Sequence, residues 1–236
     1  AKTLIKELYQ LRHPLTVKLT GDLTFKNNDL INAEKYYKDF LALEDDTFLA
    51  GEVYGQLGQI SFRKPNLFKA EDYFLKSIKL CPLEYSVHSY FYLGQMYMNS
   101  QPLKARALLE STATQGFKES FKILGFLEMN YFEDYSKAQE WFKLGMELFE
   151  MECFVGYFDC CVKLEEWVNA KRCFNSMTTL LQSNANYEPV YSNFVTTRKD
   201  KLEKLEKYST NVVMDSMHAV EAAKRQEVSK ESRWNV

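Results

Sequence analysis

Small and large apolar residues recur along the chain in a fixed order. Glycines return every 31 to 37 residues, alanines follow each glycine by 11 to 14 residues, and a large side chain stands four residues after each alanine. The glycines are Gly21, Gly58, Gly94, Gly125 and Gly156; the alanines are Ala33, Ala70, Ala105, Ala138 and Ala170; the large residues are Tyr37, Phe74, Leu109, Phe142 and Phe174. A period of this length is typical of stacked helical hairpins.

Each member of the pattern has a role in a helical hairpin. A glycine late in the first helix and an alanine early in the second let the two backbones approach closely. The residue four positions after the alanine lies on the same helix face and fills the space beside that crossing. We therefore expect helix pairs at residues 2–45, 48–81, 84–115, 118–148 and 151–183, with their boundaries uncertain by several residues.

Two segments match the consensus sequences of known repeat families. Leu57, Gly58, Ala70, Phe74, Ser77 and Pro82 occupy the L, G, A, F, A and P positions of a tetratricopeptide repeat, and the proline ends the second helix. From residue 104 the chain resembles Sel1-like repeats, with an alanine-rich helix that ends near Gly116. The expected fold class is therefore all-α, a tetratricopeptide/Sel1-like helical-hairpin solenoid, with repeats over residues 1–183.

The pattern stops after Asn184. Residues 188–208 are expected to form one further helix, charged on nearly every side, and we interpret residues 184–208 as a capping segment that covers the last apolar face. Residues 209–236 are expected to be a C-terminal tail or an extra helix.

Composition and charge narrow the function classes. Hydrophobic residues make up 46% and glycine and proline are few, as expected for a folded helical protein. A net charge of -2 makes nucleic acid an unlikely partner. No apolar run of 18 residues occurs, so membrane association is expected to be peripheral. The sequence starts at Ala1 without a leader pattern, so a targeting segment is expected to be absent or already removed.

The sequence contains no motif that indicates catalysis or the binding of a metal ion or phosphate. The three histidines lie far apart without metal-ligand spacing, and no phosphate-binding loop or nucleophile elbow occurs. We expect no enzyme activity, no cofactor, no metal and no small-molecule ligand. The cysteines are expected to be reduced and buried, and of the neighbours Cys160 and Cys161 at most one is expected to face the core.

The first helix of each pair is expected to line a peptide-binding groove. Counting each landmark glycine as the eighth position of a repeat places a mixed set of amide, aromatic, methionine and charged side chains there. The predicted groove residues are Lys18, Asp22, Glu52, Gln59, His88, Phe91, Gln95, Met98, Lys122, Phe126, Met129 and Tyr157. Such a surface suits an apolar or amphipathic peptide, although about half of the groove positions could instead form the core between repeats.

Three readings of that groove remain open at this point. Besides peptide binding, helical-repeat proteins bind RNA, as transcript-binding proteins or translational activators do, but the groove positions hold four acidic residues and only two lysines. A general co-chaperone would carry a carboxylate clamp with lysine and then asparagine four residues on. Here Lys18 is followed by Asp22, and Lys122 by Phe126, so the clamp is missing.

Longer stretches resemble one family more specifically than the repeat pattern requires. Residues 12–25, 33–44, 49–60 and 107–163, with loop wording such as MECFVGYFDCC, are similar to a budding-yeast family of mitochondrial factors. Members of that family act at the matrix side of the inner membrane and are required for export of the C-terminal tail of cytochrome c oxidase subunit two. The resemblance implies a matrix location, peripheral membrane association and partners among that tail and the membrane insertase. No site residue is carried over from it.

Overall fold

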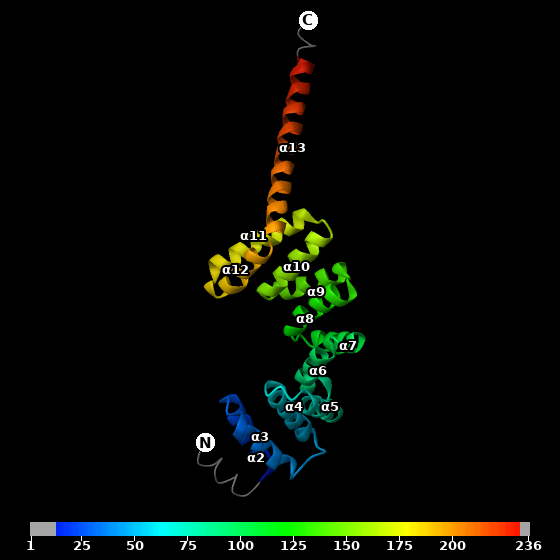
Figure 1. Ribbon diagram of the computed structural model, residues 1–236, viewed down its shortest axis with the longest axis vertical. Helices are drawn as coiled ribbons and strands as arrows, with labels where there is room; N and C mark the ends of the chain where they lie inside the picture. The colour runs from blue at the N-terminus through cyan, green and yellow to red at the C-terminus, as the bar shows by residue number, and fades with distance from the viewer. Residues whose placement is uncertain (1–12, 232–236) are drawn as a thin grey trace. The chain divides into compact units, whose positions relative to one another are not determined.

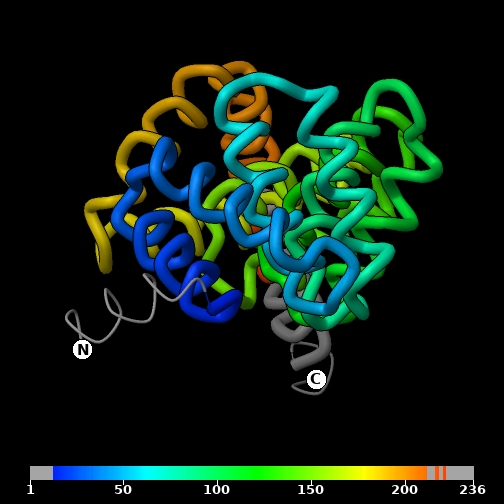
Figure 2. The backbone as a smooth tube through the Cα atoms, turned by 90° about the horizontal axis from the view of Figure 1, so that it is seen from below, coloured from blue at the N-terminus to red at the C-terminus, as the bar shows by residue number. Residues whose placement is uncertain are grey.

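The computed structural model describes residues 13–231, and beyond Asn211 it describes the side chains of only Ser216, Met217, Val220 and Glu221. Throughout this part of the chain the regular elements are helices (Figure 1). Successive helices pack side by side as antiparallel pairs (Figure 2). The chain divides into two compact units, one ending at Leu127 and the other beginning at Glu128. Each unit has its own packed interior and is considered by itself.

The first unit consists of consecutive α-helices joined by short turns. These helices are α2 (Pro14–Lys26), α3 (Leu30–Leu41), α4 (Phe48–Arg63), α5 (Leu67–Leu80), α6 (Leu83–Tyr97), α7 (Pro102–Thr114) and α8 (Glu119–Leu127). The pairs α2/α3, α4/α5 and α6/α7 form hairpins. The first two hairpins fall inside their predicted ranges, and the third begins one residue before its range, at Leu83. Residues 2–12 of the first range lie outside the described residues.

The second unit begins with a π-helical turn and ends with a long helix. Its elements are η1 (Glu128–Phe132), α9 (Tyr135–Glu147), α10 (Met151–Lys163), α11 (Trp167–Ser183), a 3₁₀ turn η2 (Ala185–Tyr187), α12 (Glu188–Thr197) and α13 (Lys199–Glu231). The fourth predicted range, 118–148, therefore contains the boundary between the two units, at the point where α8 gives way to η1.

Local sequence explains where the helices begin and end. The side chains of Asp29, Asn66 and Asp134 each accept a hydrogen bond from a backbone N–H in the first turn of the helix that follows. At the end of α7, Gly116 adopts φ +75°, and the N–H of Phe117 reaches the carbonyl of Thr112. This is a glycine-dependent helix end, as the sequence predicted.

Within the three hairpins of the first unit, each landmark glycine packs against the large residue that the repeat pattern pairs with it. A methyl group on Gly21 would lie 2.7 Å from the ring of Tyr37, and one on Gly94 would lie 2.7 Å from Leu109. Gly58 is covered in the same way by Phe74. Each glycine thus faces the large residue of its own hairpin, and these large residues are fully buried.

The second unit departs from this pairing. Gly156 of α10 faces Phe142 of α9, the preceding helix, and not Phe174 of its own hairpin. Phe174 is only half-buried and packs against Tyr191 and Phe194 of α12. The prediction for the last repeat was wrong in this respect, because α12 supplies a surface for Phe174 that the repeat pattern does not contain.

The prediction that at most one of Cys160 and Cys161 faces the core is also wrong. Both thiols are fully buried, as are Cys153 and nearly all of Cys173. Helix α10 packs against α9, α11 and α12, so it is enclosed on almost every side. Two adjacent residues on such a helix can both be buried, whereas an ordinary amphipathic helix exposes one of them.

The C-terminal region forms two helices, and the break between them lies ten residues before the predicted boundary at 208/209. The predicted helix 188–208 breaks at Arg198, with φ −121° and ψ 25°, between α12 and α13. Helix α13 then runs through the predicted boundary at 208/209 to Glu231. No glycine or proline follows Pro189, so nothing in the sequence ends the helix earlier. Phe194 and Leu205 are buried and dock this region on α10 and α11. Residues 232–236 of the predicted tail lie outside the described residues.

Candidate peptide-binding groove

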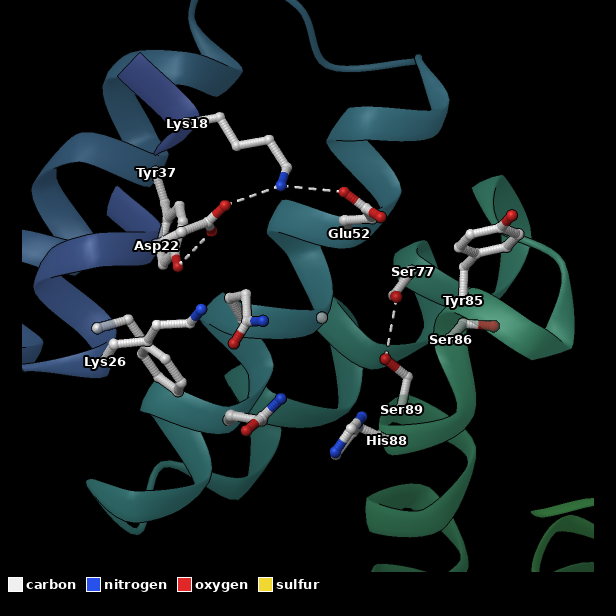
Figure 3. Close-up of a pocket in the computed structure, with 14 residues that line it drawn as sticks. Lys18, Asp22, Lys26, Tyr37, Glu52, Ser77, Tyr85, Ser86, His88 and Ser89 are labelled. Carbon is white, nitrogen blue, oxygen red and sulfur yellow. Dashed lines mark hydrogen bonds and ion pairs between the residues drawn. The ribbon is translucent and has the colours of Figure 1, made fainter. Parts of the chain in front are cut away.

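A groove of about 270 Å³ lies within the first unit, between α2, α4 and α6 (Figure 3). These are the first helices of three consecutive hairpins, which is the surface that the repeat pattern assigned to binding. Among the predicted groove residues, five line it: Lys18, Asp22, Glu52, Gln59 and His88.

Gly55 keeps the floor of the groove open. A methyl group at this position would lie 3.1 Å from Oγ of Ser77 and 3.2 Å from Oγ of Ser89. Behind it, Ser89 donates a hydrogen bond of 2.9 Å to Ser77, and both side chains are buried. The glycine therefore lets α5 and α6 approach α4 closely at the base of the groove.

One wall of the groove carries a charged cluster. Nζ of Lys18 lies 3.0 Å from Oδ2 of Asp22 in the same helix and 3.0 Å from Oε2 of Glu52 in α4 (Figure 3). Burial lowers the pKa of the Lys18 amine, but the hydrogen bonds to the two carboxylates have the larger combined effect, so the pKa of Lys18 is raised. One cation thus ties the first hairpin to the second and is itself neutralised.

Tyr37 completes this cluster from α3. Its hydroxyl donates a hydrogen bond of 2.9 Å to Oδ1 of Asp22, and burial together with that carboxylate raises the pKa of the phenol. Both carboxylate oxygens of Asp22 therefore have protein partners. The sequence pattern identified Tyr37 only as a packing residue, since its polar end has no signature in the spacing.

The opposite wall is formed by the first turns of α6. Tyr85 is 62% exposed and packs edge-on against Phe48, with ring centroids 4.8 Å apart. The hydroxyl of Ser86 donates to the carbonyl of Pro82 at 2.8 Å. His88 lies exposed at the rim, and its ring contacts the ring of Phe117 edge-on. Desolvation lowers the pKa of His88, and the negative charge of Glu119 partly offsets that decrease.

The remaining predicted residues do not belong to this groove. Phe91 and Tyr157 are buried, the first against Tyr92 and Phe117, the second in the second unit. Burial raises the pKa of Tyr157. The others are half-buried outside the groove: Gln95, Met98, Lys122 and Phe126 in the first unit, and Met129 in η1 of the second. Burial argues against a binding role for Phe91 and Tyr157, whereas the assignment of the half-buried residues to a binding surface stays a prediction.

Gln56 is one of the groove residues that the template missed. It lies one turn after Glu52 on α4, lines the groove, and its Oε1 is buried without a hydrogen-bond partner in the structure. Its i, i+4 relation to Glu52 was the available signal. Counting a fixed position within each repeat passes over it.

Neither a metal site nor a membrane-spanning helix is found in the part of the chain that the structure describes. Among the described side chains, no group of three His, Cys, Asp or Glu residues is placed to hold a metal ion. Among the described helices, none combines the length and apolarity needed to cross a membrane.

The helical hairpins and the groove on their first helices define the class of protein. The chain is an all-helical tetratricopeptide-type repeat protein, as the sequence predicted. Among solved structures it resembles a chain in the crystal structure of the APC/C hetero-tetramer Cut9-Hcn1, with a TM-score of 0.59. That likeness covers 84% of this chain and 39% of the other at 15% identity, so it concerns the fold alone.

A closer relative is known among curated proteins. The chain is 50% identical over 208 residues to Protein MSS2, mitochondrial, of Saccharomyces cerevisiae. The match covers 88% of this chain and 59% of the length of that protein. The chain therefore spans somewhat more than half of its relative. No family model matches the sequence.

Proposed function

We propose that this protein is a non-enzymatic, protein-binding repeat protein of mitochondria that assists export of the C-terminal tail of cytochrome c oxidase subunit two. It acts at the matrix side of the inner membrane as a peripheral protein and thereby serves oxidase assembly. The observation that carries this proposal is the 50% identity to Protein MSS2, mitochondrial, over most of the chain. The stretch at residues 151–161, expected to be a loop, instead forms most of the buried helix α10, so its likeness to that family is a likeness of packed residues and adds no separate support.

The groove on α2, α4 and α6 supplies the mechanism. It holds the emerging tail, or a segment of an insertase partner, and so raises the local concentration of that segment at the membrane. Three of its charged groups are bound to one another, since Lys18 links Asp22 and Glu52. They position a ligand and perform no chemistry on it.

The charge of the groove disfavours the transcript-binding alternative. Lys18 is held between two carboxylates, and one carboxylate oxygen of Glu52 remains open. A phosphate backbone would meet that negative charge, while RNA-binding surfaces present uncompensated lysine and arginine.

Site-specific photo-crosslinking tests the proposal. A photoreactive residue is placed at Gln59 in the groove of the full-length protein, and newly made mitochondrial chains are radiolabelled. Lys69, exposed on α5 away from the groove, is the matched control position. We expect adducts to oxidase subunit two or to an insertase component from Gln59 and none from Lys69.

The other outcomes contradict parts of the proposal. Adducts to RNA from Gln59 would move the function to transcripts. A probe at Phe126, on α8 outside the groove, separates the two surfaces that the repeat template placed together. Adducts to oxidase subunit two or to an insertase component from Phe126, with none from Gln59, would show that the binding surface lies outside the groove.

A further inference from the structure

The anionic wall of the groove is only partly satisfied. Lys18 contacts Glu52 through Oε2, and among the described residues no other group donates a hydrogen bond to this carboxylate. The glutamate side chain is 28% exposed. Lys18, Asp22 and Glu52 together carry a charge of about −1. Oε1 of Glu52 is therefore an open, negatively charged acceptor inside the groove.

A second acceptor without a partner lies one helical turn further along α4. Oε1 of Gln56 is buried and has no hydrogen-bond partner in the structure, although Gln56 lines the groove. An unpaired buried acceptor is destabilising, and a ligand that donates a hydrogen bond to it would remove that cost. Residues four apart on a helix have Cβ atoms roughly 5 to 6 Å apart, so one ligand group can reach both acceptors.

Three hydroxyls that line the groove already donate hydrogen bonds within the protein. Ser89 donates to Ser77, Ser86 donates to the carbonyl of Pro82, and Tyr37 donates to Asp22. These hydroxyls do not reach the acceptors of Glu52 and Gln56, and a complementary ligand brings N–H groups to them. Lys26, the other cation lining the groove, is exposed on the last turn of α2 and can stay in solvent.

An aromatic ring lines the same space. Tyr85 is 62% exposed and packs one side against Phe48, which leaves it accessible at the groove wall on α6 (Figure 3). Aromatic faces attract cations, and guanidinium groups stack on them more often than ammonium groups bind them. The wall opposite the open carboxylate thus also favours a cation.

We propose that the groove binds an arginine side chain presented by a peptide segment of the partner protein. The guanidinium donates to Oε1 of Glu52 and lies near the ring of Tyr85, and the Gln56 side chain turns toward the groove so that its Oε1 accepts a second hydrogen bond. Arginine fits better than lysine because its planar group carries five donors in a fixed fork and spans separated acceptors. This inference rests on the proposed function, since it names the chemistry by which the groove recognises a protein segment.

Peptide libraries with one fixed position test this recognition. Four fluorescein-labelled libraries of twelve-residue peptides have random flanks and a central arginine, lysine, citrulline or norleucine. Their binding to the full-length protein is followed by fluorescence anisotropy at low salt. We expect the arginine library to bind most tightly, and citrulline, which has the same shape without the charge, to bind at least about tenfold more weakly.

Variants assign the effect to the two acceptors. Glu52→Gln is expected to weaken the arginine library by about tenfold or more and to leave the norleucine library unchanged. Gln56→Met, which keeps the charge and the approximate volume, is expected to weaken arginine binding by about threefold to tenfold. Glu140→Gln, an exposed residue of α9, makes the same charge change outside the groove and is expected to have no effect.

Several results would overturn the inference. Equal binding of the arginine and citrulline libraries, or no binding by any library up to millimolar concentration, would exclude arginine recognition. Arginine recognition at this site would also be excluded if Glu52→Gln and Gln56→Met both fold and bind the arginine library as the wild type does. If Glu52→Gln loses its helical circular dichroism signal, that variant is unfolded, and the effect of Gln56→Met on arginine binding alone tests the proposal. None of these results depends on the photo-crosslinks from Gln59, which test separately whether the groove holds an export partner.

Discussion

Arg198, between α12 and α13, binds the carboxylate of Asp159 in α10 through two nitrogens. Nε lies 2.9 Å from Oδ1, and Nη2 lies 2.6 Å from Oδ2. Lys201 adds a third bond of 2.9 Å to the same carboxylate. One nearly buried aspartate thus fixes the start of α13 to the packed part of the second unit.

Replacing Asp159 by asparagine is expected to loosen the docking of α12 and α13. Two cations would lose their counter-charge at a partly buried position, which we expect to cost about 2 kcal/mol, discounted for the solvent access of both cations. Hydrogen exchange of the α12 and first-turn α13 amides measures this as faster opening. Asp200→Asn, an exposed neighbour, is the control. Equal exchange in the two variants would show that apolar packing alone holds these helices.

Gly58→Ala is expected to destabilise the second hairpin by about 1 to 2 kcal/mol. The added methyl group would overlap the ring of Phe74, and that ring is stacked on Tyr92 at a centroid distance of 5.3 Å, so it cannot move freely. Alanine's better helix propensity offsets about 1 kcal/mol of the cost. Urea unfolding gives the value.

The double variant Gly58→Ala with Phe74→Leu tests the cause of that loss. If the clash is with the ring, the two substitutions together cost less than the sum of their separate effects. Additive costs would mean that the strain lies in the helix backbone itself.

The Ser77–Ser89 pair is expected to behave as a unit. Ser89→Ala leaves the buried Ser77 hydroxyl without its partner, at a cost of about 1 to 2 kcal/mol, while Ser77→Ala with Ser89→Ala removes both groups and costs less than the sum. Denaturant unfolding of the single and double variants measures the coupling. Ser176→Ala, exposed on α11, controls for loss of a hydroxyl and should change stability little. Additive losses would argue against the pair.

Stability is expected to fall at alkaline pH because of the buried thiols. Burial raises the pKa of Cys160 from 9.0 to about 12 and that of Cys161 from 9.0 to about 11. Below pH 9 both states keep these protons, so the thiols add no pH dependence. Between pH 9 and their folded-state pKa values only the unfolded chain ionises, which lowers the free energy of unfolding by up to about 1.4 kcal/mol per pH unit for each thiol.

Comparing the wild type with Cys160→Ala isolates this effect from tyrosine and lysine titration. Urea midpoints from pH 8 to pH 10.5 should fall less steeply in the variant. Parallel curves would mean that Cys160 ionises as readily in the folded protein as in the unfolded chain.

The hairpins were predictable because their determinants are local. A glycine such as Gly58 and an aromatic residue such as Phe74 lie within one hairpin, and the asparagine and aspartate caps act within one turn. The contacts that the periodicity encodes are therefore short-range in sequence. Within the groove, five of the twelve predicted residues meet because they lie on the first helices of adjacent hairpins.

Residues whose surroundings come from distant helices were placed wrongly or missed. Gly156 faces Phe142 and not Phe174, since α12 covers Phe174 from outside the repeat pattern. Phe91 was assigned to the groove but is buried against Phe117, a residue of the next turn. Burial depends on which element lies on the far side of a helix, and spacing along one helix carries no such information.

The sequence by itself determined the helical class, the hairpin order and the first-helix surface, because periodic apolar positions must be buried wherever the chain folds. Only the tertiary structure decided that Lys18 is neutralised between Asp22 and Glu52, that Cys160 and Cys161 are both enclosed, and that α13 is fixed by Asp159. These features depend on distances between side chains from separate helices, which the packing of the whole unit sets.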